Sequence, residues 1–144
     1  MRLVIRTSLP SLLRFGAWGC IAILAILSLL PANELWRTGL ARLGYGTQME
    51  HVIAYCGATI CIGLAWQARM GRLLVGLMLI AYAAILETAQ FYTGGRNASL
   101  LDFAASAAGV VAGAILIPAA GRSLMRMLVP AAPAQATPPA NRDS

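Results

Sequence analysis

The chain has 144 residues, of which 59% are hydrophobic and 11% are charged, and its formal net charge is +6. A soluble domain carries about 25% charged residues, so the composition indicates a protein whose main solvent is lipid. A strongly basic chain is also typical of nucleic-acid binding, but here the arginines stand singly between apolar runs. The length predicts one domain, and a nucleic-acid partner is excluded.

Four apolar segments follow one another, at about residues 15–33, 51–68, 73–92 and 100–118. A transmembrane helix needs about 20 apolar residues, within a range of about 17 to 25, so each segment is long enough. The short connections after the second and third segments make consecutive helices antiparallel. We therefore expect an all-α fold, an integral membrane bundle of four antiparallel transmembrane helices within residues 15–121.

The two ends of the chain lie outside this bundle. Residues 1–14 are expected to form a cytoplasmic N-terminal segment. The proline- and alanine-rich residues 122–144 have no apolar periodicity, which predicts a disordered cytoplasmic tail. The N-terminal arginines and the apolar run after them also resemble a signal peptide. Because Pro31 lies where a small-residue cleavage motif is needed, we expect an uncleaved first helix.

The arginines predict the orientation in the membrane. Eight of them lie before the first segment, between the second and third, or after the fourth: Arg2, Arg6, Arg14, Arg69, Arg72, Arg122, Arg126 and Arg142. The other side has three, Arg37, Arg42 and Arg96. Cytoplasmic loops carry the excess of basic residues, so both termini are expected to face the cytoplasm of a bacterial plasma membrane.

This orientation brings the polar ends of the segments together on the outer side. Glu87 lies about five residues inside its segment, roughly 8 Å at 1.5 Å per residue, where a carboxylate is costly and normally paired. Arg96, across a glycine turn, offers two parallel hydrogen bonds, and Gln90 shares the face of Glu87. The pair either contributes to a binding site or only pins the hairpin.

His51 and Tyr55 are four residues apart and share a helix face. They form either an acid–base or ligand-orienting pair, or a solvated histidine at a helix start. One histidine with Glu87 and Asp102 makes a weak metal site, so neither a metal nor another cofactor is expected. The three cysteines lie in apolar runs and are interpreted as small packing residues: Cys20, Cys56 and Cys61.

The fourth segment carries a stripe of polar and small residues on one helix face: Asp102, Ser106, Gly109 and Gly113. The two glycines form a GxxxG motif, which lets another helix approach closely, so Asp102 and Ser106 should point into the bundle. Residues 47–50 (TQME) and 99–102 (SLLD) also match capping boxes, in which a hydroxyl and a carboxylate satisfy backbone N–H groups at a helix start.

The same residues resemble the signature of the VanZ-like family of membrane proteins. The matching positions are His51, Tyr55, Glu87, Gln90, Gly95, Arg96, Asp102, Gly109 and Gly113. The resemblance covers about residues 45–118, and the chain departs from it at Ser106, where the family has Asn, and at Gln48, where it has Lys. It implies a small multi-helix protein of the bacterial cell envelope, and some members are associated with resistance to the glycopeptide teicoplanin.

Together these observations predict a binding protein rather than an enzyme. Its polar layer would hold or modulate an envelope lipid, a lipid-linked glycan or a partner membrane protein. A small membrane enzyme that acts on a lipid-linked substrate, with His51 and Glu87 or Asp102 as acid and base, is the second reading. A purely structural membrane protein is the third. A transporter is disfavoured because no segment is interrupted at mid-depth.

The first prediction concerns topology. Reporter fusions after Arg14 and after Arg122 should report a cytoplasmic position, and a fusion within residues 94–97 should report an external one, because of the arginine bias. An external C-terminus would contradict the orientation.

Overall fold

The computed structural model describes residues 2–30, 46–66, 71–93 and 98–128. Its elements are α1 (Arg2–Leu29), α2 (Gly46–Trp66), α3 (Arg72–Ala89), the 3-10 turn η2 (Gln90–Tyr92) and α4 (Leu100–Leu128). The described ranges contain no strand. All four α-helices are long and apolar enough to cross a membrane. The chain is thus an all-α, multi-pass membrane protein, as the four apolar segments predict.

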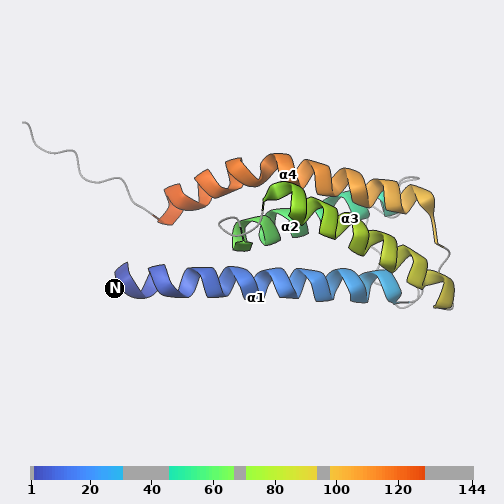
Figure 1. Ribbon diagram of the computed structural model, residues 1–144, viewed down its shortest axis with the longest axis horizontal. Coiled ribbons are helices and arrows are strands. Elements are labelled where there is room, and N and C mark those ends of the chain that lie inside the picture. The colour runs from blue at the N-terminus through green and yellow to red at the C-terminus, as the bar shows by residue number, and fades with distance from the viewer. Residues whose placement is uncertain (1, 31–45, 67–70, 94–97, 129–144) are drawn as a thin grey trace, which may run out of the picture.

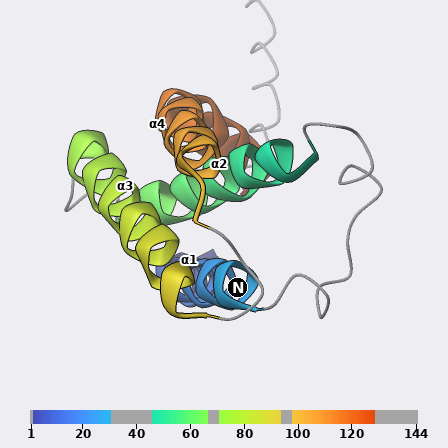
Figure 2. The ribbon, with the colours of Figure 1, turned by 90° about the vertical axis from the view of Figure 1, so that its right-hand side faces the viewer.

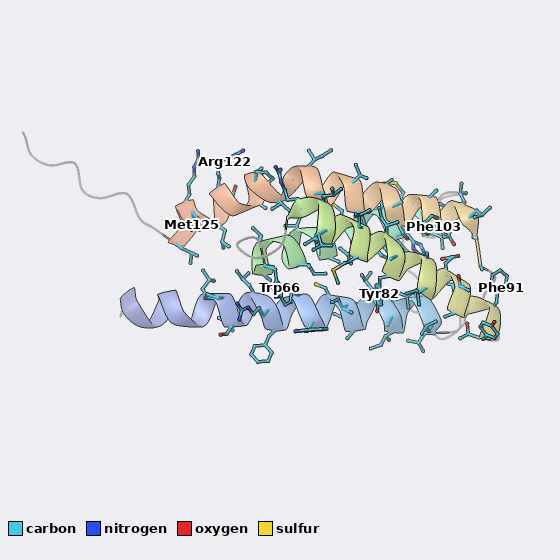
Figure 3. All side chains as sticks on the ribbon, viewed as in Figure 1. Trp66, Tyr82, Phe91, Phe103, Arg122 and Met125 are labelled. Carbon is cyan, nitrogen blue, oxygen red and sulfur yellow. The ribbon has the colours of Figure 1, made fainter. Side chains whose placement is uncertain are left out.

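The helices alternate in direction along the chain. The start of α1 and the last turns of α4 lie at one end of the bundle (Figure 1). At the other end, which we call the hairpin end, α1 and α3 finish and α2 and α4 begin. The labelled side chains mark both ends, because Phe91 and Phe103 lie near the hairpin end and Arg122 and Met125 at the other (Figure 3). Alternation therefore makes α2 parallel to α4, and α1 parallel to α3.

The helices α1 and α4 lie on opposite sides of the bundle, with α2 and α3 between them (Figure 2). The most extensive contact joins α2 to α4. Because lipid tails are as apolar as the helix surfaces, such a contact depends on close van der Waals packing rather than on the hydrophobic effect.

Glycines make the contact between α2 and α4 close. A Cβ atom at Gly113 would lie 2.6 Å from Cβ of Thr59 and 2.7 Å from the carbonyl oxygen of Cys56. A Cβ atom at Gly109 would meet the backbone of Val52. It would lie 3.0 Å from Cα of Val52, which is closer than an ordinary carbon–carbon contact. The GxxxG face of α4 thus lies directly on the backbone of α2, as the stripe of small residues predicts.

The outer surface of the bundle is apolar and part of its interior is polar. Large apolar side chains are exposed on every helix, including Phe15, Ile53, Leu77, Ile85 and Ile115. Several polar side chains are buried: Ser28, Thr59, Glu87, Gln90 and Ser106. Apolar exposure on this scale is expected of a surface in contact with lipid, where polar groups turn inward to find partners.

Two helices extend further than the sequence predicts. Helix α1 runs through residues that were expected to precede the bundle, and its apolar window, Leu9–Leu29, includes Arg14. Helix α4 continues to Leu128, ten residues past the expected end of its span. Its 29 residues measure about 44 Å, longer than the bilayer core of about 30 Å. Hydropathy marks the apolar part of such a helix and gives no signal where the helix continues into the interface.

The second prediction follows from the glycine contacts. Gly113→Ala should destabilise the bundle by about 1–3 kcal/mol, because the added methyl overpacks a helix crossing. Gly57→Ala is the matched control: a Cβ atom there would meet no neighbouring atom within 4 Å, so alanine should improve helix stability slightly. Thermal unfolding in detergent measures both changes, and equal melting temperatures for the two variants would contradict the close contact.

Candidate functional site

Two side-chain hydrogen bonds join α2 to α4 near the hairpin end. Gln48 Nε2 donates to Asp102 Oδ1 at 3.0 Å, and His51 Nδ1 lies 3.0 Å from Ser106 Oγ. The partners are 54 and 55 residues apart in sequence, so the two parallel helices are in register here. We call these four residues, together with Tyr55, the α2–α4 polar cluster.

The bonding of Ser106 determines which nitrogen of His51 carries the proton. The Ser106 hydroxyl donates its one proton to the carbonyl oxygen of Asp102 at 2.9 Å, a common bond to the preceding helical turn. Ser106 Oγ can then only accept from His51. We therefore assign neutral His51 the Nδ1–H tautomer, which leaves its Nε2 as an acceptor.

Tyr55 extends the cluster along α2. Its ring is parallel to that of His51, at an interplanar angle of 10° and a centroid distance of 6.4 Å. Tyr55 is 4% exposed, so its ring is buried within the bundle. The spacing of His51 and Tyr55 in sequence thus predicts their shared face correctly.

One polar atom of the cluster lacks a partner. The Oε1 atom of Gln48 is buried and accepts no hydrogen bond from the residues that the structure describes, while Nε2 of the same amide is bonded to Asp102. A buried acceptor without a donor costs about 1–3 kcal/mol, so its presence indicates that a donor from water or from a ligand belongs beside it.

Other polar contacts join α3 and η2 to α1, one at the hairpin end and one midway along the bundle. Gln90 Nε2, on η2, donates to Ser28 Oγ at 3.0 Å and to the Ser28 carbonyl oxygen at 3.2 Å. Tyr82 donates its hydroxyl proton to the carbonyl oxygen of Ile21 at 2.9 Å, and its ring lies between α3 and α1 (Figure 3). These bonds tie α1 to α3. Gln90 therefore binds α1, whereas Glu87 binds the start of α4.

Glu87 belongs to the last turn of α3, and its side chain lies against the start of α4. It is 9% exposed, and its Oε1 accepts a hydrogen bond from the backbone N–H of Ser99. A carboxylate at a helix N-terminus is stabilised by the free N–H groups and the helix dipole there. The burial that the sequence predicts for Glu87 is present. Its described partner is a backbone N–H, and the expected partner, Arg96, lies outside the described residues.

The capping box at residues 99–102 forms in part. Ser99 Oγ accepts from the backbone N–H of Asp102 at 3.4 Å, but the Ser99 N–H is bonded to Glu87, while Asp102 Oδ1 is bonded to Gln48. At residues 47–50 the expected box is wrong, because α2 is already helical from Gly46 and Thr47 is not the cap. Glu87 and Gln48 come from other parts of the chain, so the local capping pattern does not predict them as partners of Ser99 and Asp102.

The structure therefore separates the predicted site residues into groups. His51, Tyr55, Asp102 and Ser106 come together in the α2–α4 polar cluster, with Glu87 nearby. Gln90 pairs with α1 instead. Among the residues that the structure describes, no three histidine, cysteine or acidic side chains are grouped to hold a metal ion.

Sequence reasoning misses two residues of these contacts. Gln48 is noted only as a departure from a family signature, yet its spacing gives a signal: Gln48, His51, Tyr55 and Thr59 recur at helical intervals and face the stripe on α4. Ser28 gives no such signal, because one serine in an apolar run is unremarkable and only the packing of α1 on α3 shows its partner.

The fold and the site define the class as a multi-pass, four-helix membrane protein with a polar cluster at its hairpin end. Comparison with protein-family models, curated proteins and solved structures gives no match.

The third prediction tests the tautomer of His51. The chain has one histidine, so ¹⁵N-histidine labelling yields a single imidazole in the NMR spectrum. In the neutral form, Nδ1 should show the shift of a protonated nitrogen and Nε2 that of an unprotonated one, because Ser106 accepts from Nδ1. Ser106→Ala removes this acceptor and should move the proton towards Nε2. A neutral wild type with its proton on Nε2 would contradict the bonding scheme.

Proposed function

We propose that this chain is a VanZ-like protein of the bacterial cell envelope that binds a polar head group of an envelope lipid or lipid-linked glycan. It spans the plasma membrane with both termini in the cytoplasm, so the hairpin end faces the outer leaflet. The arginine bias supports this orientation, and the resemblance in residues 45–118 supports the family.

The partnerless acceptor of Gln48 is the observation that carries the binding proposal. A cluster with a purely structural role in an apolar bundle would be expected to satisfy its own buried polar atoms. The position fits as well, because Gln48, His51 and Asp102 all lie within about two turns of a described helix start, at the depth of lipid head groups.

The contact between His51 and Ser106 favours an enzyme in one respect, since a hydroxyl beside an imidazole is a common nucleophile–base arrangement. Three observations count against it. Ser106 is 2% exposed, and its proton is held by the carbonyl oxygen of Asp102. The described polar partner of Asp102 is Gln48 rather than His51, so the triad geometry is not made. Binding accounts better for the arrangement.

The fourth prediction tests the binding function with isosteric variants. Asp102→Asn keeps an oxygen for Gln48 and removes the charge. It should leave membrane abundance near normal while reducing co-purified polar lipid about tenfold or more, because hydrogen bonds to charged groups are worth about 1.5–3 kcal/mol. Native mass spectrometry of the full chain in mild detergent measures the bound lipid.

Thr88→Ala is the control, because Thr88 is exposed and bonded only to its own helix, at the carbonyl oxygen of Ala84. When the two variants are expressed in a deletion strain, Asp102→Asn and Thr88→Ala should give different teicoplanin susceptibilities. If Asp102→Asn retains normal abundance, bound lipid and susceptibility, the cluster is structural and the binding function is wrong.

A further inference from the structure

Several side-chain donors near the hairpin end are already engaged within the described part of the protein, although the second N–H of Gln48 and the hydroxyl of Tyr55 are not among them. Gln48 Nε2 is bonded to Asp102, and the Ser106 hydroxyl is bonded to a carbonyl oxygen. His51 Nδ1–H is bonded to Ser106. On α3 and η2, Gln90 Nε2 is bonded twice to Ser28. A ligand therefore finds few side-chain donors among the described residues.

Acceptors are left over in the α2–α4 polar cluster. Gln48 Oε1 has no partner. His51 Nε2 and the second carboxylate oxygen of Asp102 carry lone pairs for which the described part of the chain supplies no donor. Because a ligand gains most by supplying what a site lacks, this excess of acceptors favours a ligand that brings hydrogen-bond donors.

The helix dipoles favour an anionic ligand instead, because α2 and α4 both begin here and helix N-termini attract anions. Carboxylates already occupy these positions, however. Glu87 accepts from the backbone at the start of α4, Asp102 lies in its first turn, and Glu50 lies near the start of α2. An incoming anion would meet these carboxylates at short range in a medium of low dielectric constant, where repulsion is strong.

Three basic residues of α3 and α4 lie at the opposite end of the bundle. Arg72 begins α3, and Arg122 and Arg126 lie in the last turns of α4; Arg122 is labelled there in Figure 3. Along α4, Arg122 lies about 30 Å beyond Asp102 at 1.5 Å per residue, so the arginines at the end of α4 do not neutralise Asp102.

From this arrangement we infer that the cluster recognises a primary ammonium group, which combines positive charge with several N–H donors, as in an ethanolamine head group. The inference rests on the proposed binding function and specifies its ligand. The ammonium would donate to Asp102, to His51 Nε2 and to Gln48 Oε1 after a small shift of that buried amide.

The test compares head groups that differ in one property. The purified full chain in detergent is titrated with short-chain phosphatidylethanolamine, phosphatidylcholine and phosphatidylglycerol, and binding is followed by the ¹⁵N shift of His51 Nε2. Choline is a cation without N–H donors, so ethanolamine should bind at least about tenfold tighter, which corresponds to about 1.4 kcal/mol. Asp102→Asn should abolish this preference, and Thr88→Ala should preserve it.

The source of the ammonium group is tested with water-soluble glycerophosphoethanolamine. If this compound competes with the lipid, the head group alone is recognised. If the lipid binds and this compound does not compete, the acyl chains contribute to recognition. Equal binding of ethanolamine and choline lipids, lost in Asp102→Asn, would overturn the ammonium inference and leave a binding site. A preference for phosphatidylglycerol would also overturn it. Failure of every head group to bind would remove the binding function itself.

Discussion

The close approach of α4 to α2 is the contact on which the polar cluster depends. Side chains at Gly109 and Gly113 would collide with the backbone and Thr59 of α2, so only glycine permits this separation. Near the other end the glycine is on α2 and the large side chain on α4, because Ile117 of α4 fills the space beside Gly63 of α2. Two parallel helices held this closely have one register over several turns. That register sets Gln48 opposite Asp102 and His51 opposite Ser106.

The polar groups near the hairpin end divide into two sets. One set is the α2–α4 polar cluster, and the other ties α1 to α3 through Ser28 and Gln90. In the second set, the side-chain amide of Gln90 makes two hydrogen bonds to Ser28, so we interpret this set as structural. The first set contains a buried acceptor without a partner among the described residues. This difference in hydrogen-bond satisfaction, rather than polarity itself, separates the proposed binding site from the α1–α3 contact.

Glu87 illustrates how one residue serves several purposes. A carboxylate inside a membrane segment is costly unless it is paired, and here the N-terminus of α4 supplies an N–H donor. The same bond fixes the end of α3 against the start of α4. It also gives the cluster a negative charge within electrostatic range of Tyr55, which adds to the preference for a cationic ligand.

The sequence by itself determined the four helices and their alternation, because apolar length and the spacing of charges respond directly to the bilayer. It also determined which residues share a face, since 3.6-residue periodicity places His51 with Tyr55 and Asp102 with Ser106 and the glycines. Only the tertiary structure decided that α4 packs on α2, that Gln48 belongs to the cluster, and that Glu87 is bonded to the backbone of Ser99. The physical reason is that these choices depend on the lateral order and register of the helices. Small packing differences between helix faces set that order and register, and neither hydropathy nor local capping patterns encode them.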